Sequence, residues 1–210
     1  MPGPRVLVFD LDHTLVSSPL DLRAMAQDLL VFLRDQGVEL PAREPRWSVP
    51  ELARFVREQA PRLEGEFWEI ALAHEQRALQ EAELEPGALE ALRAARAIGF
   101  RTVVWTNNGG AATREVLERF ALTPHLDLIV SRDQVRHLKP DPDGFRVIFE
   151  RWPDLEEIFL VGDSWVDGLA AQARGVPFIA YRADREELER RGVLVWAAIT
   201  HLSEVRALFA

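Results

Sequence analysis

Residues 6–15, VLVFDLDHTL, join a short apolar run to two carboxylates and then a hydroxyl. The run over residues 5–9 predicts a buried β-strand, because strands covered on both faces are short, apolar and rich in β-branched side chains. Ligands of open α/β sheets bind just beyond the carboxyl ends of the strands, where Asp10 and Asp12 are expected. This pair indicates a bound divalent cation, covalent catalysis or both. The alternative is a polar turn, since Asp and Thr favour turns.

Composition is that of an ordinary soluble domain. The chain has 210 residues, 48% of them hydrophobic and 28% charged, which is enough for one sizeable core with a modest insertion. Its net charge of −9 argues against nucleic acid and membrane-surface partners, which recruit clustered Lys and Arg. Cysteine is absent, so disulfides and thiolate sites are excluded. We find no signal peptide and no apolar run of membrane-spanning length, and therefore expect a cytoplasmic protein, monomeric or homodimeric.

The single lysine of the chain is a candidate site residue. Of 25 basic Lys and Arg residues, only Lys139 is a lysine. Biased coding composition explains the general excess of arginine but gives no reason for one exception. Lys and Arg are not interchangeable where a compact point charge on a slim stem is needed. We therefore expect Lys139 to serve the site.

A long block after the first strand carries only helical patterns. Apolar residues recur at three- and four-residue intervals up to Gly37, whose position is typical of a C-cap. Ser48 and Glu51 form a capping-box pattern at a second helix start, and Pro61 opens a third helix. We therefore predict an inserted all-helical domain. Its expected elements are helices over residues 20–37, 50–59 and 61–83, with a proline-containing loop over 38–47.

From residue 87 onward, helical and strand patterns alternate. Such alternation predicts right-handed crossovers and a parallel sheet covered by helices on both faces. The predicted fold is α/β, a Rossmann-like doubly wound parallel sheet formed by residues 1–17 and 85–210, with the helical insertion at 18–84. Expected helices cover residues 88–98, 111–120, 145–151, 167–174, 185–191 and 202–209; expected strands cover 101–105, 126–130, 158–161, 178–181 and 193–197.

Polar residues follow two more of these strands. Residues 106–110, TNNGG, follow the strand at 101–105 and lead into a helix, an arrangement that can seat a phosphate, although an ordinary strand-to-helix turn explains it equally well. Residues 162–167, GDSWVD, follow the strand at 158–161, and Lys139 precedes the helix leading into that strand. Because the carboxyl ends of parallel strands meet at one edge, these groups should converge on Asp10 and Asp12.

Four carboxylates at one edge of a sheet indicate a cation. Without one they would repel each other, and Mg²⁺ suits them because it prefers hard oxygen ligands and leaves room for water and a phosphate. The five histidines are scattered, so no transition-metal cluster competes. Carboxylates, Mg²⁺, a hydroxyl and a lysine suit phosphoryl transfer, in which a carboxylate can also act as the nucleophile. The four acids are Asp10, Asp12, Asp163 and Asp167.

With these residues assembled, the chain resembles the haloacid dehalogenase-like hydrolase superfamily, which is mostly phosphatases. Four short motifs carry the resemblance, in order along the whole chain. The helical block after the first motif is similar to the family's cap domain, and the phosphoglycolate phosphatase-like branch has the most similar layout. The motifs are DLDHT at residues 10–14, TN at 106–107, KP at 139–140 and GDSWVD at 162–167.

The resemblance implies a role for each motif residue. Asp10 would attack phosphorus, and Asp12 would protonate the leaving oxygen and then activate water. Thr106 and the Asn107 backbone would hold the phosphoryl group, while Lys139 would pair with Asp10 and the phosphate. Mg²⁺ would be bound by Asp10, the Asp12 carbonyl and Asp163, with Asp167 a ligand or one layer further out. An acid at position 12 favours phosphate esters over halides, because a halide leaves without a proton.

Substrate specificity is expected from the cap, which in such enzymes closes over the site. His13 departs from the family pattern, in which glycine is common, and its side chain would narrow the pocket. Arg23, Trp47, Arg54 and Trp68 are candidate substrate contacts, although for each of them an ordinary solvated or packing role is the better explanation. Arginines near the substrate would favour a small anionic phosphorylated metabolite such as phosphoglycolate.

The leading prediction is therefore a magnesium-dependent small-molecule phosphatase. A phosphomutase using the same aspartyl-phosphate is the alternative within enzymes. A receiver-like signalling protein phosphorylated on Asp10 is the alternative from another class, but receivers have no helical insertion and need no acid placed as Asp12 is.

Overall fold

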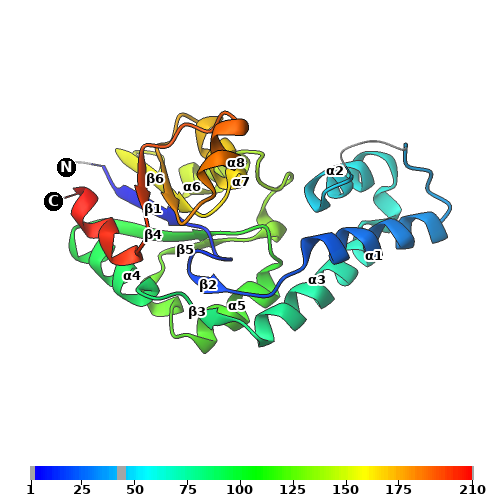
Figure 1. Cartoon of the computed structure of the whole chain (residues 1–210), viewed down its shortest axis with the longest axis horizontal. Coiled ribbons are helices and arrows are strands. Elements are labelled where there is room, and N and C mark those ends of the chain that lie inside the picture. The colour runs from blue at the N-terminus through cyan, green and yellow to red at the C-terminus, as the bar shows by residue number, and fades with distance from the viewer. Residues whose placement is uncertain (1–2, 42–45, 210) are drawn as a thin grey trace. The chain divides into compact units, whose positions relative to one another are not determined.

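The computed structural model describes residues 3–41 and 46–209 (Figure 1). The chain divides into two compact units, Met1–Ser18 with Ala82–Ala210, and Pro19–Glu81. We propose that these units are the core and cap domains expected from the sequence, whose predicted boundaries were residues 18 and 84. Among the described residues, no helix combines the length and apolarity needed to cross a membrane.

The first unit is built on a six-stranded parallel sheet of order β5-β4-β1-β6-β7-β8. The predicted strand at residues 5–9 is its β1, which pairs on both sides, so that Val8 lies beside Val103 of β4 and Leu160 of β6. Val6 and Phe9 are fully buried, as a strand covered on both faces requires. The strands are β1 (Arg5–Phe9), β4 (Phe100–Trp105), β5 (Leu128–Val130), β6 (Glu157–Gly162), β7 (Phe178–Tyr181) and β8 (Ala197–Ile199).

Helices cover both faces of this sheet (Figure 1). The chain runs from β1 towards β5 with α4 and α5 on one face, then reverses towards β8 with α6, α7 and α8 on the other. This reversal follows from right-handed crossovers made in opposite directions. The doubly wound α/β prediction is confirmed. The helices are α4 (Ala88–Ala97), α5 (Gly110–Arg119), α6 (Gly144–Arg151), α7 (Trp165–Gln172) and α8 (Arg185–Arg190), with 3-10 turns at η2 (Thr123–His125), η3 (Arg132–Gln134) and η4 (Leu202–Phe209).

The second unit is all-helical, and its helices pack through the predicted apolar stripes. Met25, Leu29 and Leu33 are buried along one face of the first helix, at the spacing that predicted it. Ser48 and Glu51 form the expected capping box, with the Ser48 N–H donating to Glu51 Oε2 at 2.9 Å. The elements are α1 (Leu22–Asp35), α2 (Val49–Gln59), η1 (Pro61–Leu63) and α3 (Glu64–Gln80). Of the predicted loop at 38–47, residues 42–45 lie outside the described residues.

Three element predictions need correction. The strand predicted at 193–197 is β8, three residues long and centred further on, because its apolar start is a surface loop in which Leu194 is 73% exposed. The helix predicted to reach residue 83 ends at Gln80, because β3 (Glu83–Leu84) pairs antiparallel with β2 (Val16–Ser17). The terminal helix is of the 3-10 type. The two-residue strands β2 and β3 are too short to produce a sequence pattern.

Candidate active site

Three strands deliver the predicted motifs to one edge of the sheet. The Phe9 position of β1 pairs with Val104 of β4 and with Val161 of β6. Asp10, directly after β1, therefore lies between the residues that follow the other two strands, Thr106 after Trp105 and Asp163 after Gly162. The carboxyl ends of the strands thus place the three motifs side by side, as parallel pairing requires.

Lys139 lies at the centre of this edge. Its Nζ atom is 2.5 Å from Asp10 Oδ1, 2.6 Å from Asp167 Oδ1 and 2.9 Å from the Trp105 carbonyl oxygen. The three donor positions of the ammonium group are thereby matched to three acceptors. Lys139 and Asp167 are each only 2% exposed and Asp10 is 7% exposed, so the ion pairs are shielded from solvent.

Asp163 and a nearby serine complete the acidic cluster. Carboxylate oxygens of Asp10, Asp163 and Asp167 all lie within 4.8 Å of one another. Both oxygens of Asp167 already accept hydrogen bonds, one from Lys139 and one from Ser164 Oγ at 2.8 Å. Three carboxylates with one lysine leave an excess of negative charge, and hard oxygen donors in this number fit Mg²⁺.

The pKa values of Asp10, Lys139 and Asp163 reflect the same excess of negative charge. Burial raises the pKa of Asp10 well above its usual range; Lys139 opposes this effect, while the carboxylates of Asp167 and Asp163 add to it. Burial alone would lower the pKa of Lys139, but Asp10 and Asp167 outweigh it and raise that pKa. Burial, followed by repulsion from Asp167, raises the pKa of Asp163 to about 7. A bound cation would favour the ionised carboxylates.

Asp12 is held apart from this ion-pair cluster. Its Oδ1 accepts a hydrogen bond from Ser18 Oγ at 2.6 Å, and its Oδ2 accepts one from Asn108 Nδ2 at 2.6 Å. Neutral donors therefore contact this carboxylate, whereas a lysine contacts the carboxylate of Asp10. Two acids one residue apart thus have different surroundings, which is the usual basis for different chemical roles.

The two side chains of the TN motif, Thr106 and Asn107, make different contacts. Thr106 is buried beside the carboxyl edge, and its Oγ1 accepts the Asn108 N–H at 3.1 Å. The Asn107 amide forms a reciprocal pair with the Lys139 backbone, accepting its N–H at 2.9 Å and donating to its carbonyl at 3.1 Å. The Asn107 side chain therefore fixes the loop that carries the lysine, a contact that the sequence did not predict.

Gly162 of the fourth motif is required by close packing. A Cβ atom at this position would lie 2.6 Å from Cβ of Asp167. Any side chain would displace Asp167 from the lysine, which explains glycine before the acid of this motif.

The predicted specificity residues divide between the two units. His13 is exposed in the first unit and has a left-handed φ of 55°, which is uncommon for a residue other than glycine. Arg23, Trp47, Arg54 and Trp68 all belong to the helical unit, where Trp47 packs edge-on against Phe55. Their contact with a substrate stays a prediction.

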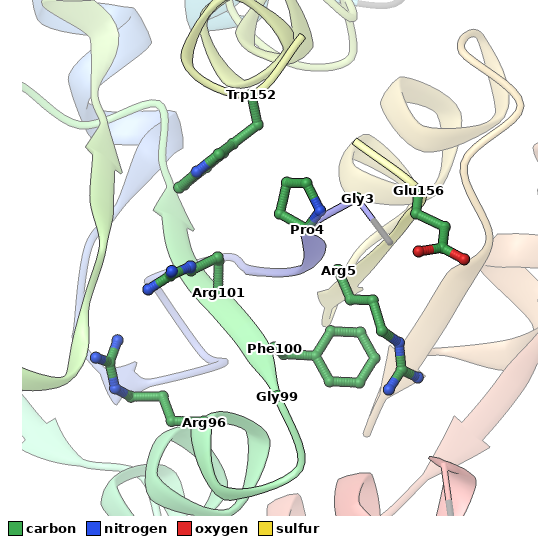
Figure 2. Close-up of a pocket in the computed structure, with 9 residues that line it drawn as sticks. All are labelled: Gly3, Pro4, Arg5, Arg96, Gly99, Phe100, Arg101, Trp152 and Glu156. Atoms are coloured by element: carbon green, nitrogen blue, oxygen red, sulfur yellow. The ribbon is translucent and has the colours of Figure 1, made fainter. Parts of the chain in front are cut away.

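A groove at the opposite edge of the sheet does not resemble a second anion site (Figure 2). Arg5, Arg96 and Arg101 line it, but each of them already pairs with a carboxylate. Arg5 pairs with Glu157 at 2.6 Å, while Arg96 and Arg101 both pair with Asp127.

Asn108, Ser18 and Ser164 are site residues that sequence reasoning missed. Asn108 and Ser164 lie within the quoted motifs and could have been singled out as the polar neighbours of motif residues. Ser18 carried no signal, because its contact with Asp12 depends on the path of the chain through β2.

Comparison with known proteins identifies the family of this chain. The family model of the haloacid dehalogenase-like hydrolases matches residues 4–175. A phosphoglycolate phosphatase from Cereibacter sphaeroides is 32% identical over 86% of this chain and 85% of its own length. A plasmid-encoded phosphoglycolate phosphatase from Cupriavidus necator is also 32% identical, over 87% of this chain and 82% of its own length.

Solved structures agree on the fold. A haloacid dehalogenase phosphatase from Thermococcus onnurineus superposes with a TM-score of 0.64 at 21% identity, covering 98% of both chains. A haloacid dehalogenase-like family hydrolase from Streptococcus pneumoniae gives a TM-score of 0.65 at 18% identity and covers 99% of both chains. With the family model matching most of the chain and curated relatives matching along most of their length, the chain belongs to the haloacid dehalogenase-like hydrolases and is a phosphatase of the phosphoglycolate phosphatase-like group.

Proposed function

We propose that this phosphatase hydrolyses a small organic phosphate monoester with Mg²⁺, through an aspartyl-phosphate formed on Asp10. The observation that carries the proposal is the contact of one buried ammonium group with both Asp10 and Asp167, at 2.5 Å and 2.6 Å. This pairing favours the ionised form of Asp10 against the effect of burial, and a bound cation would favour it further, as a nucleophilic carboxylate requires. Thr106, at the start of the neighbouring loop, supplies a hydroxyl for the phosphoryl oxygens.

Two half-reactions follow from the two acids. A carboxylate oxygen of Asp10 bonds to phosphorus while the ester P–O bond breaks, and Asp12 gives its proton to the leaving oxygen. Asp12, now ionised, takes a proton from water as that water attacks phosphorus. The P–O bond to Asp10 then breaks, and inorganic phosphate leaves with both acids in their starting states.

The acidic cluster fits the proposed cation. Asp10 and Asp163 would bind Mg²⁺ together with the Asp12 carbonyl, and Asp167, whose two oxygens are engaged, would hold Lys139 in place. When bound, Mg²⁺ neutralises charge on the phosphoryl oxygens. Thr106 and the Asn107 backbone would orient the phosphoryl group, and the positive charge of Lys139, whose three donors are engaged, would attract it.

The test is phosphate release from 4-nitrophenyl phosphate by an Asp10→Asn variant. This substitution keeps the shape of the side chain but removes its nucleophilic charge, so turnover should fall below detection. Asp154→Asn is the matched control, because Asp154 is exposed and precedes β6 at the opposite end of that strand. Retained activity in Asp10→Asn would refute the covalent mechanism. When the reaction is run with substrate labelled in its phosphoryl group and quenched with acid, the native enzyme should carry the label on Asp10, and Asp10→Asn should carry none.

The substrate that we propose is phosphoglycolate or a similar small anionic monoester. Support comes from the curated relatives of that name and from the candidate arginines Arg23 and Arg54 of the helical unit. We place the reaction in the cytoplasm. A panel of phosphorylated metabolites assayed for free phosphate with and without Mg²⁺ tests this assignment; an isomerised sugar phosphate instead of free phosphate would indicate the phosphomutase.

A further inference from the structure

The carboxylate of Asp12 is fixed at both oxygens by donors from two separate segments. Asn108 follows β4 and Ser18 follows β2, and each is about 2.6 Å from its own oxygen of Asp12. Asn108 is 5% exposed and Ser18 is 3% exposed, so water does not compete freely for these contacts. Rotation of the Asp12 side chain must therefore break at least one short, part-buried hydrogen bond.

Asn108 is itself fixed at its backbone. Its N–H donates to Thr106 Oγ1 at 3.1 Å, and its carbonyl accepts the Arg132 N–H at 3.0 Å. One residue thus connects the threonine proposed to hold the phosphoryl group with the acid proposed to protonate the leaving oxygen. The position of Asp12 relative to the phosphate seat is therefore determined through Asn108.

From this geometry we infer that Asn108 and Ser18 are positioning residues for proton transfer by Asp12. A carboxylate offers about four lone-pair sites, and the two donors occupy one on each oxygen. The proton of Asp12 must then lie on one of the remaining sites, in a direction that the two donors determine. This inference rests on the proposed role of Asp12 as proton shuttle, and it adds two residues that act through Asp12 without touching the reacting atoms.

The basicity of the leaving group separates this role from general support of the fold. A strongly basic phenolate needs a proton as it leaves, whereas a weakly basic phenolate leaves without help. Loss of orientation at Asp12 should therefore harm poor leaving groups selectively. A change that only reduces the amount of folded enzyme lowers all rates by the same factor and leaves their ratio unchanged.

The experiment measures kcat/KM for phenyl, 4-nitrophenyl and 2,4-dinitrophenyl phosphate, which reports the steps up to the first phosphoryl transfer. In Asn108→Ala and in Ser18→Ala we expect kcat/KM for phenyl phosphate to fall about 10- to 100-fold and that for dinitrophenyl phosphate to fall less than about 3-fold. Ser18→Thr, which keeps the hydroxyl, should retain the native ratio. Thr113→Ala is the matched control, because the buried hydroxyl of Thr113, in α5, donates to the carbonyl of Gly109, just before α5, and not to Asp12.

An equal loss on all three substrates in both alanine variants would overturn the inference. Because the readout is a ratio, partial misfolding of one variant does not imitate the expected result, and the two variants remove donors from different segments. Asp12→Asn separates the two proposals. If the ratio of kcat/KM between phenyl and dinitrophenyl phosphate changes in Asp12→Asn but not in Asn108→Ala and Ser18→Ala, only the positioning inference fails. If that ratio stays native in Asp12→Asn, the proton-shuttle role of Asp12 fails and the positioning inference fails with it.

Discussion

At the scale of single residues, Lys139 explains why one position of an arginine-rich chain is a lysine. Its slim stem lets a single ammonium group reach two carboxylates and a carbonyl while the residue stays only 2% exposed. A planar guanidinium is larger and presents its donors as a fork, which suits one carboxylate edge-on better than three separate acceptors.

Replacing this lysine should damage both stability and catalysis. In Lys139→Met, the metal-free protein should lose about 3–5 kcal/mol of unfolding free energy, because Asp10 and Asp167 remain buried without their cation. Urea denaturation in EDTA measures this loss, and phosphate release should be abolished. Unchanged stability would show that other groups neutralise the two acids.

Magnesium affinity should depend on pH in a defined direction. The pKa of Asp163 is raised to about 7, and that of Asp10 is raised as well, so below pH 7 protons compete with the cation for these carboxylates. Mg²⁺ should therefore bind more tightly at pH 8 than at pH 6, with protons released on binding. Calorimetry in two buffers of different ionisation enthalpy measures both effects; an affinity independent of pH would contradict the predicted protonation.

At the scale of elements, the site depends on helices seated closely on the sheet. Gly144 begins α6 directly over Trp105, and a Cβ at this position would lie 2.1 Å from an indole carbon. Trp105 ends β4, and its carbonyl is one of the three acceptors of Lys139. The packing of α6 on β4 therefore helps to position the Trp105 carbonyl that Lys139 contacts.

The variant Gly144→Ala should therefore destabilise the protein, by about 1–3 kcal/mol, because an added methyl group cannot fit without shifting α6 or the indole ring. Gly65→Ala is the control, since a Cβ there meets nothing within 4 Å in α3 and alanine favours the helix by up to about 1 kcal/mol. Chemical denaturation of both variants tests the contrast. Equal stability of Gly144→Ala and Gly65→Ala would show that α6 or the Trp105 ring can shift without cost to make room for the methyl group.

Sequence patterns also reach their limit at this scale. Alternation placed β1, β4, β6 and β7 correctly, because buried strands need short apolar runs. The apolar residues Leu194 and Trp196 indicated a strand two to four residues too early, yet they are 73% and 49% exposed. Apolarity alone does not distinguish a buried strand from an exposed loop when the run lies at the edge of the sheet.

At the scale of the whole molecule, the proposed chemistry and the proposed specificity belong to different units. The motif residues lie in the unit of Met1–Ser18 with Ala82–Ala210, and four of the five candidate specificity residues lie in Pro19–Glu81. A substitution in the helical unit should therefore change substrate preference without changing the intrinsic reactivity of the site.

Arg23→Ala tests this division. If Arg23 binds the anionic group of phosphoglycolate, its loss should lower kcat/KM for that substrate about 10-fold, the cost of one hydrogen bond to a charged group, and leave 4-nitrophenyl phosphate within about 2-fold. Arg62→Ala, another exposed arginine of the helical unit, serves as the control. A parallel loss on both substrates would place Arg23 outside substrate recognition.

The sequence by itself determined the α/β class and the parallel sheet. It also determined that Asp10, Thr106, Lys139 and Asp163 come together at the carboxyl ends of the strands. These features follow from local patterns, since short apolar runs make buried strands and parallel strands bring their carboxyl ends together. Only the tertiary structure decided which groups hold the motif residues: Ser18 and Asn108 on Asp12, the Asn107 side chain on the Lys139 loop, and Asp167 on Lys139. Three of these four contacts join residues from 28 to 96 positions apart, and Ser18 reaches Asp12 through a ribbon of two-residue strands, so no local pattern encodes them.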